Sequence, residues 1–374
     1  MKIMILVKRF PPKRIGGTEL ATLSIANHLS GKDHQVHVVT TYDEGTREAD
    51  SKHKFSVHRI HFPGIRFLGV FIFSLNVLRL AYDLKPDLIH AQGVGMGFTA
   101  LVIKKLLKIK YVIWGRGTDV FAEGKLKRII SKMELRGACA VISLTNKMQK
   151  KIKETYAVKN SYTIPNGIEL DKFDFKNRKI SREHLDIPEG IPLITFVGNL
   201  RRVKGVEYLI KAFQILLNSG RDCKLLIIGD GPERKDLISL VDTLGIQKNV
   251  IFTGSIPREN IMDYLRISDI FVLPSLSEGF PNVILEAMAA GLPIVTTNFE
   301  GSSEIVEDGV NGFIVQTKNP KALADSIAEI LDDFNVKQSM SARNREAVAK
   351  YDWGNIIIHL EKIYDQCLGL NNSD

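Results

Sequence analysis

Short apolar runs alternate with helix-like segments along the whole chain, and this alternation constrains the fold more than any other feature. Strand-like runs of the first half are IMILV, QVHVVTT, DLIHAQ, YVIWG, AVISLT and YTIP. Those of the second half are PLITFVG, KLLIIG, NVIFTG, IFVLPS, PIVTT and GFIVQ. Stretches between them, such as TELATLSIANHL, repeat apolar residues every three or four positions. The alternation predicts an α/β fold of parallel sheets joined by right-handed crossovers.

Six strand-like runs in each half predict two doubly wound, Rossmann-like domains in series. A chain of 374 residues is long enough for two cores. The segment between Pro165 and Pro188 is polar and shows neither the apolar spacing of a helix nor that of a strand. The boundary between the two domains should therefore lie there. We therefore expect domains at 1–180 and 181–353.

Composition narrows the class of protein. The formal net charge of +9 favours anionic partners without choosing among phosphates, lipid and nucleic acid. The three cysteines, Cys139, Cys223 and Cys367, form no CxxC pair, which fits a reducing cytoplasm. No His/Cys cluster has the spacing of a metal site, and neither GxGxxG nor a P-loop is present.

Membrane spans and leader peptides are not expected. The first apolar run, Ile3 to Val7, has five residues and is too short for a signal-peptide core. The longest, FLGVFIFSLNVL (Phe67 to Leu78), has 12 residues, whereas a spanning helix needs roughly 20. The sequence predicts a cytoplasmic protein that is soluble or lies on a membrane surface.

Ligands of open α/β sheets bind beyond the carboxyl ends of the strands. After PLITFVG come Arg201, Arg202, Lys204 and Gly205 at a helix start, where cations and backbone amides suit an anion. A solvated basic loop explains the same residues equally well.

The stretch SEGFPNVILEAMAAG, Ser277 to Gly291, places one carboxylate, Glu286, in an otherwise apolar helix. Burying an unpaired carboxylate is costly, so Glu286 should have a partner or a ligand. Gly279 allows close approach of a ligand, and Glu286 follows the helix start by about 7–8 Å along the axis. A diphosphate at the helix start could therefore bring a ribose to Glu286. The alternative is a solvent-facing Glu286 and an ordinary loop acid at Glu278.

Three other strand ends carry candidate residues. Gly16 and Gly17 follow IMILV before a helix, where a phosphate or sugar could approach the backbone. Arg116 follows YVIWG together with Asp119, and DLIHAQG carries His90, which we expect to be structural. The turn from Gly229 to Pro232 is also expected to be structural.

These residues resemble a known family. EGFPNVILEAMAAGLPIVTT resembles the E-x7-E signature of retaining glycosyltransferases of family 4, which have two Rossmann-like domains facing each other across a cleft (GT-B architecture). IGGTELATLSIANHL, DLIHAQG, RGTDV, IPNGIELDKF, FVGNLRRVKGVEYLIKAF, IIGDGPERKDL, VIFTGSIP and SSEIVEDGVNGFIV match in order. The resemblance covers essentially the whole chain. It also implies that the last helix, 354–374, crosses back and completes the first domain.

The resemblance implies a role for each candidate residue. Glu286 would bind the nucleotide ribose, Glu278 the hydroxyls of the donor sugar, and Lys204 the diphosphate. Backbone groups around the helix start would hold sugar and diphosphate, and two glycines would face the diphosphate from the other domain. These further donor-site residues are Gly279, Phe280, Asn282, Val283, Gly16 and Gly17.

Two departures from the family pattern matter. Asn199 stands where many members carry arginine, and Arg201 or Arg202 is the candidate to supply that charge. Arg116 stands where members commonly carry histidine. An arginine could hold a donor oxygen or phosphate but could not act as a base. Arg116 is therefore predicted to be a donor-site residue.

The predicted activity is transfer of a sugar from a nucleotide-diphosphate sugar, with a UDP-sugar favoured. The acceptor would be a glycan, a lipid-linked compound or a small molecule, and no nucleic acid partner, metal or cofactor is expected. Lys204, Glu278 and Arg116 are the predicted catalytic residues. A nucleotide-sugar epimerase and a nucleotide-sugar-binding subunit without activity are the alternatives, and an NAD enzyme is disfavoured because the glycine fingerprint is missing.

The sequence also raises peripheral association with an anionic membrane. KKLLKIK (Lys104 to Lys110), KLKRIISKMELR (Lys125 to Arg136) and NKMQKKIK (Asn146 to Lys153) mix cations with apolar residues, and Phe67 to Leu78 adds an apolar segment. Ordinary helices with buried apolar faces and solvated lysines explain these patterns slightly better.

Overall fold

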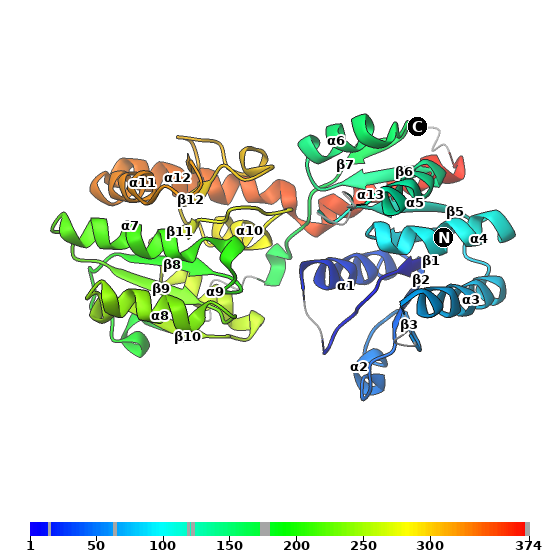
Figure 1. Cartoon of the computed structure of the whole chain (residues 1–374), viewed down its shortest axis with the longest axis horizontal. Coiled ribbons are helices and arrows are strands. Elements are labelled where there is room, and N and C mark those ends of the chain that lie inside the picture. The colour runs from blue at the N-terminus through cyan, green and yellow to red at the C-terminus, as the bar shows by residue number, and fades with distance from the viewer. Residues whose placement is uncertain (14–15, 63–65, 118–119, 121–123, 173–179, 371–374) are drawn as a thin grey trace. The chain divides into compact units, whose positions relative to one another are not determined.

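The chain forms two compact α/β units (Figure 1). The computed structural model describes residues 1–13, 16–62, 66–117, 120, 124–172 and 180–370. Unit 1 comprises Met1–Gly167 and Trp353–Asp374, and unit 2 comprises Ile168–Asp352. The chain thus leaves unit 1 earlier than residue 180, and the last helix belongs to unit 1.

Unit 1 is built on a seven-stranded parallel sheet of order β3-β2-β1-β4-β5-β6-β7. Its strands are β1 (Lys2–Leu6), β2 (Gln35–Thr41), β3 (Ser56–Ile60), β4 (Leu88–Gln92), β5 (Lys110–Trp114), β6 (Ala140–Ser143) and β7 (Ser161–Thr163). The sequence predicted six strands here and missed β3. That strand lies at the sheet edge, and its five residues SVHRI are exposed or half-buried and include no apolar run.

The helices of unit 1 cover both faces of its sheet. They are α1 (Gly17–Ser30), α2 (Arg47–Asp50), α3 (Arg66–Leu84), α4 (Gly97–Leu107), α5 (Lys125–Gly137), α6 (Asn146–Tyr156) and α13 (Trp353–Leu368), with the 3₁₀ turn η1 (Val94–Met96). Helices α3 to α6 form one layer in which each contacts the next, whereas α13 contacts α1 and β5. Because the connections from β3 to β7 all advance in one direction, right-handed crossovers place α3 to α6 on the face opposite α1.

Unit 2 has a six-stranded parallel sheet of order β10-β9-β8-β11-β12-β13. The strands are β8 (Leu193–Val197), β9 (Lys224–Ile228), β10 (Val250–Gly254), β11 (Ile270–Leu273), β12 (Ile294–Thr297) and β13 (Gly312–Val315), which are the six predicted. The helices are α7 (Val206–Asn218), α8 (Arg234–Thr243), α9 (Arg258–Arg266), α10 (Asn282–Ala289), α11 (Pro320–Asp332) and α12 (Phe334–Ala347). The predicted fold class, two doubly wound parallel-sheet domains, is confirmed.

Helix α10 is apolar on nearly every side because it is surrounded. It contacts α9, α12, β11 and β12, and six of its residues are buried, Glu286 among them. The helix that the sequence singled out is therefore an interior element of unit 2.

Candidate active site

Two loops at the carboxyl ends of the neighbouring strands β8 and β11 are held against each other. The loop after β8 contains the 3₁₀ turn η5 (Arg202–Lys204), followed by Gly205 with φ +63°. A Cβ at Gly205 would lie 2.2 Å from the carbonyl oxygen of Pro274, so only glycine permits this approach. The Leu276 amide also donates to the Val203 carbonyl at 2.7 Å.

This approach brings together two residues that the sequence singled out. Lys204 Nζ lies 2.6 Å from Glu278 Oε1, and Ser275 Oγ donates to the same oxygen at 2.6 Å. The Lys204 and Glu278 side chains are 21% and 12% exposed, so the pair is largely shielded but reachable. An ammonium suits a phosphate, and a carboxylate accepts hydrogen bonds from sugar hydroxyls.

The start of α10 lies next to Glu278 in the chain. Pro281 is the N-cap residue and provides no side-chain hydrogen bond to the first turn. The first amides of a helix lack partners within the helix and carry partial positive charge. Gly279, Phe280, Asn282 and Val283 are half-buried around this start, which has the character of an anion site.

Glu286 has a partner that the sequence did not reveal. Arg258, the first residue of α9, donates from Nη2 to Glu286 Oε1 at 2.5 Å. Burial raises the pKa of Glu286, while Arg258 acts in the opposite direction. Among the described residues, no hydrogen bond to Glu286 Oε2 is found, so this oxygen can accept one from a ligand.

The surrounding loops support this site. Arg201, which directly precedes η5, and Arg202, the first residue of η5, are both exposed. The turn 229–232 packs on the loop after β8: the Leu200 amide donates to the Asp230 carbonyl at 2.9 Å, and a Cβ at Gly229 would lie 1.9 Å from Gly198 O. The expectation that this turn is structural is confirmed.

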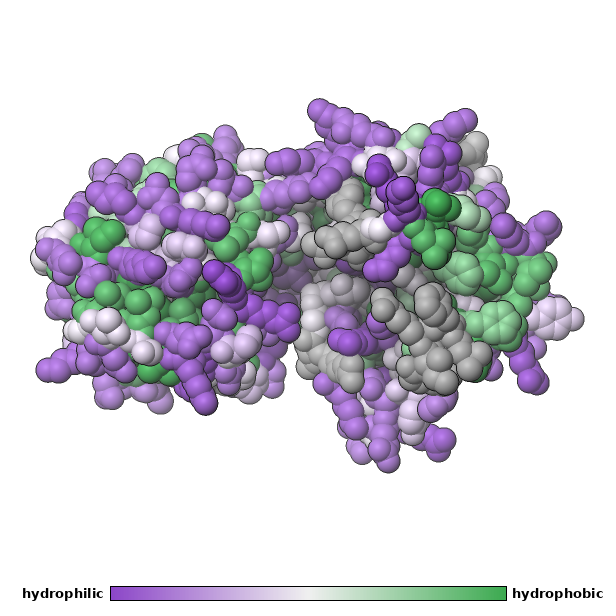
Figure 2. All heavy atoms as spheres, viewed as in Figure 1, coloured by the Kyte–Doolittle hydropathy of each residue, from purple (hydrophilic) through white to green (hydrophobic). Residues whose placement is uncertain are grey.

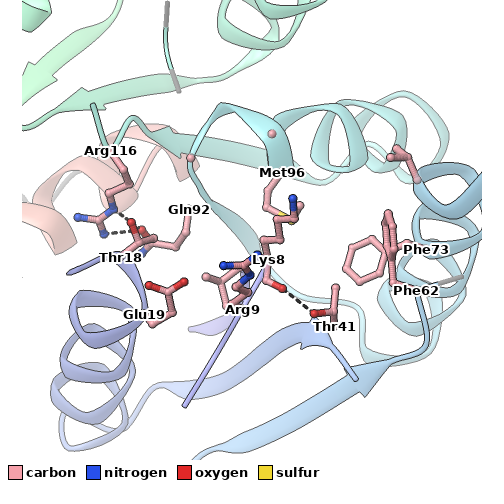
Figure 3. A pocket seen from close by; sticks show the side chains of 14 residues that line it. Lys8, Arg9, Thr18, Glu19, Thr41, Phe62, Phe73, Gln92, Met96 and Arg116 are labelled. Atoms are coloured by element: carbon pink, nitrogen blue, oxygen red, sulfur yellow. Dashed lines mark hydrogen bonds between the residues drawn. The ribbon is translucent and has the colours of Figure 1, made fainter. Parts of the chain in front are cut away.

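Unit 1 has a cavity of about 560 Å³ at the carboxyl ends of its central strands (Figure 3). Its lining is cationic and polar at one end and apolar at the other. The lining residues are Val7, Lys8, Arg9, Thr18, Glu19, Thr41, Phe62, Val70, Phe73, Gln92, Gly93, Gly95, Met96 and Arg116. Of the predicted residues of unit 1, Arg116 lines the cavity, whereas Gly16 and Gly17 directly precede two lining residues.

Arg116 is held by three neighbours. Its guanidinium lies over the Trp114 ring at 4.2 Å from the centroid, Nε donates to Gln92 Oε1 at 2.7 Å, and Nη1 donates to Asn166 Oδ1 at 2.7 Å. Gln92 ends the strand-like run DLIHAQ, but the sequence did not identify Gln92, Asn166 or Trp114 as partners of Arg116. Asp119, the predicted companion of Arg116, lies outside the described residues.

His90 is structural, as expected. It is fully buried, and its Nδ1 lies 2.5 Å from the Tyr364 hydroxyl. Burial, with Arg116 nearby, lowers the pKa of His90 to about 3, so the ring is neutral. In the described part of the chain, no group of three or more His, Cys, Asp or Glu residues has metal-site geometry.

Comparisons with known proteins agree with these observations. The family model "Glycosyltransferase Family 4" matches residues 15–172, and "Glycosyl transferases group 1" matches residues 177–347. An uncharacterized glycosyltransferase of Methanocaldococcus jannaschii is 29% identical over 97% of this chain and 98% of its own. The N-acetyl-alpha-D-glucosaminyl L-malate synthase of Bacillus anthracis is 26% identical over 97% of both chains.

Solved structures share the fold. Sucrose-phosphate synthase of Thermosynechococcus elongatus superposes with a TM-score of 0.86 at 20% identity, over 99% of this chain and 100% of that chain. The Anabaena protein HepE in complex with UDP superposes with a TM-score of 0.83 at 21% identity, over 98% of this chain and 100% of that chain. With matching family models along both units, this chain belongs to glycosyltransferase family 4 and has the GT-B architecture.

Proposed function

We propose that this glycosyltransferase is a retaining enzyme that transfers a hexosyl group from a nucleotide-diphosphate sugar without a metal ion. The observation that carries the proposal is the Lys204–Glu278 pair at the start of α10, with Glu286 one turn further along the same helix. Cation, helix start and carboxylates suit the diphosphate, sugar and ribose of such a donor.

The spacing on α10 supports this assignment. Glu286 lies four positions after Asn282, which is about 6 Å along the axis at 1.5 Å per residue. A diphosphate held by the first amides of α10 would extend its ribose toward Glu286. Oε1 is fixed by Arg258, and Oε2 would accept the ribose hydroxyls.

The same groups would assist departure of the nucleotide. As the bond from the sugar C1 to the diphosphate oxygen breaks, negative charge grows on the diphosphate and the sugar becomes oxocarbenium-like. Lys204, Arg201 and the start of α10 would stabilise that charge. The acceptor oxygen would bond to C1 on the face that the diphosphate leaves, and its proton would pass to the departing phosphate oxygen.

Because Lys204 already pairs with Glu278, binding of the donor would have to rearrange this ion pair. The incoming diphosphate would share or take over the ammonium, and Glu278 would turn to the sugar hydroxyls. Arg201 and Arg202 make no ion pair among the described residues, so they would add positive charge when the Lys204 charge is shared.

A UDP-sugar is the favoured donor. Support comes from the Anabaena neighbour, whose structures contain UDP and UDP-glucose. The proposal also includes Gly16, Gly17 and Arg116 of unit 1 as donor contacts, which the family resemblance implies. The acceptor would be a glycan, a lipid-linked compound or a small molecule, and the enzyme would act in the cytoplasm.

Thermal unfolding with UDP, GDP and ADP at equal concentrations tests the donor class. A ligand that binds the folded state raises the midpoint by mass action, so UDP should give the largest shift. Glu286→Gln should reduce that shift, and Glu329→Gln, an exposed carboxylate of α11, should not. If no nucleotide diphosphate shifted the wild-type midpoint, the proposal would be abandoned.

A further inference from the structure

Large apolar side chains are exposed on three neighbouring helices of unit 1. Figure 2 shows hydrophobic residues gathered over α3, α4 and α5. The residues are Val70, Phe71, Leu75 and Tyr82 of α3, Phe98 and Leu106 of α4, and Leu126, Ile129 and Met133 of α5. Because α4 contacts both α3 and α5, we treat them as one surface, the α3–α5 face.

Helix α5 shows the pattern most clearly. Its buried residues are Ser131, Glu134 and Leu135, so it presents few apolar atoms to unit 1. Leu126, Ile129 and Met133 are 66%, 57% and 50% exposed, and their spacing of three and four places them in one stripe. A helix that only covers a sheet would bury its apolar stripe against that sheet. The exposed stripe of α5 therefore indicates a contact with a partner outside unit 1.

The α3–α5 face is also basic. Helices α4 and α5 contain seven Lys and Arg residues and one carboxylate, Glu134, which is buried. The exposed cations of α4 and α5 are Lys105, Lys125, Lys127, Arg128, Lys132 and Arg136. A second copy of the chain docked on the same face would oppose like charges, whereas an anionic bilayer offers both negative charge and apolar depth.

We propose that the α3–α5 face docks on an anionic lipid bilayer. Its apolar side chains would enter the boundary between headgroups and acyl chains, and its lysines would contact lipid phosphates. No described helix is long and apolar enough to cross a membrane, so this contact lies on the surface. Helix α6 is not part of the face: Met148, Ile152 and Tyr156 are buried, as in the alternative of an ordinary helix that the sequence analysis favoured for Asn146 to Lys153.

The cavity of unit 1 shares α3 with this face. Val70 is exposed on α3 and also lines the cavity, whose apolar end contains Phe62 and Phe73, with ring centroids 6.1 Å apart (Figure 3). Lys8 and Arg9 line the same cavity. We infer that the acceptor is an anionic lipid-linked compound presented by the bilayer. This inference rests on the proposed transfer reaction.

Co-sedimentation of the full chain with vesicles tests the docking. Vesicles of phosphatidylglycerol and phosphatidylcholine are compared with vesicles of phosphatidylcholine alone, at low and high salt. We expect binding to the anionic vesicles that weakens with salt. Lys127→Gln/Arg128→Gln/Lys132→Gln should lower the partition coefficient about a hundredfold, from about fivefold per cation. Leu126→Ser/Ile129→Ser/Met133→Ser should lower it more than about tenfold.

Matched variants of unit 2 serve as controls. Lys235→Gln/Lys248→Gln/Lys318→Gln removes three exposed cations, and Phe334→Ser removes an exposed apolar side chain. Both should bind vesicles like the wild type. Equal binding to anionic and neutral vesicles, or equal losses in face and control variants, would overturn the docking. So would a wild-type dimer that the α5 serine variant converts to a monomer without vesicle binding.

Titration with UDP separates this inference from the proposed function. The face variants lie outside the candidate active site, so they should bind UDP like the wild type. Loss of vesicle binding with intact UDP affinity supports the docking. Absent UDP affinity in all proteins, with vesicle binding intact, would leave the docking standing and remove the transfer proposal and the inferred acceptor.

Discussion

At the scale of single residues, Glu286 shows which contacts could be predicted from the sequence and which could not. Its isolation among apolar residues of a predicted helix indicated that it needed a partner or ligand, and the structure supplies Arg258. That arginine could not be predicted because it lies 28 residues earlier and meets Glu286 only through packing of α9 on α10. The Lys204–Glu278 pair joins positions 74 apart and likewise depends on tertiary structure.

Replacing Glu286 by glutamine should weaken UDP binding by about 1–3 kcal/mol, as expected when a charge-assisted hydrogen bond in a shielded site is lost. Because burial raises the pKa of Glu286, the neutral amide should be tolerated by the fold. Isothermal titration calorimetry measures the affinity, with Glu329→Gln as the control. A folded variant with wild-type affinity would remove Glu286 from the site.

At the scale of elements, the strands of unit 2 and the interior helix α10 follow from the sequence because apolar runs are a strong local signal. The edge strand β3 was missed because its residues are exposed or half-buried and its polar side chains leave no continuous apolar run. Which apolar residues of α5 face outward could not be predicted either. Periodicity identifies the apolar positions along one side of a helix. It does not show whether that side packs against the rest of the unit or faces solvent.

Gly205 is the element-scale test of how the two active-site loops are joined. Gly205→Ala should destabilise unit 2 because a Cβ would lie 2.2 Å from Pro274 O in addition to the left-handed backbone, φ +63°. Gly245→Ala is the matched control, since Gly245 has φ +68° and no atom within 4 Å of a Cβ. The control should cost about 1–2 kcal/mol, and Gly205→Ala at least about 2 kcal/mol more.

Urea unfolding followed by far-UV circular dichroism measures this difference. Trp114 and Trp353 are the two tryptophans, and both belong to unit 1, so their fluorescence should be unaffected. Equal costs for the two substitutions would show that the contact with Pro274 is relaxed in solution.

Glu134 of α5 should make unit 1 sensitive to pH. Burial raises its pKa from 4.5 to about 7, so the folded state holds the proton more tightly than the unfolded chain. The resulting stabilisation is full below pH 4.5 and is lost as the pH rises through about 7. It amounts to about 3 kcal/mol.

Tryptophan fluorescence during urea unfolding, at several pH values across that window, measures the effect. Glu134→Gln cannot titrate at this position, so its free energy of unfolding should lack this part of the pH dependence. As the pH rises, its free energy of unfolding should increase relative to that of the wild type. Parallel pH profiles for the two proteins would mean that Glu134 is not buried as an acid.

At the scale of the whole molecule, two α/β units and the family follow from the order of motifs along the chain. The point at which the chain passes from one unit to the other does not, because Ile168 joins unit 2 through backbone contacts with Tyr351 and Asp352, far along the chain. The α3–α5 face could not be predicted from the sequence either, because it exists only once the three helices have packed side by side in unit 1.

Turnover should persist in EDTA, because Lys204, Arg201 and the start of α10 are proposed to carry the role of a metal ion toward the diphosphate. Release of UDP from a UDP-sugar is measured with and without the chelator. Complete loss of release that magnesium or manganese restores would show that a metal is required.

The most direct test of the central claim is proton NMR of UDP-sugars incubated with the enzyme, which follows the nucleotide and the C1 configuration together. The account predicts that UDP is released and that the transferred or freed sugar first appears with the anomeric configuration of the donor. Inverted configuration would contradict the retaining mechanism. An epimerised UDP-sugar without release of UDP, or no consumption of any donor despite UDP binding, would contradict the assignment of transfer itself.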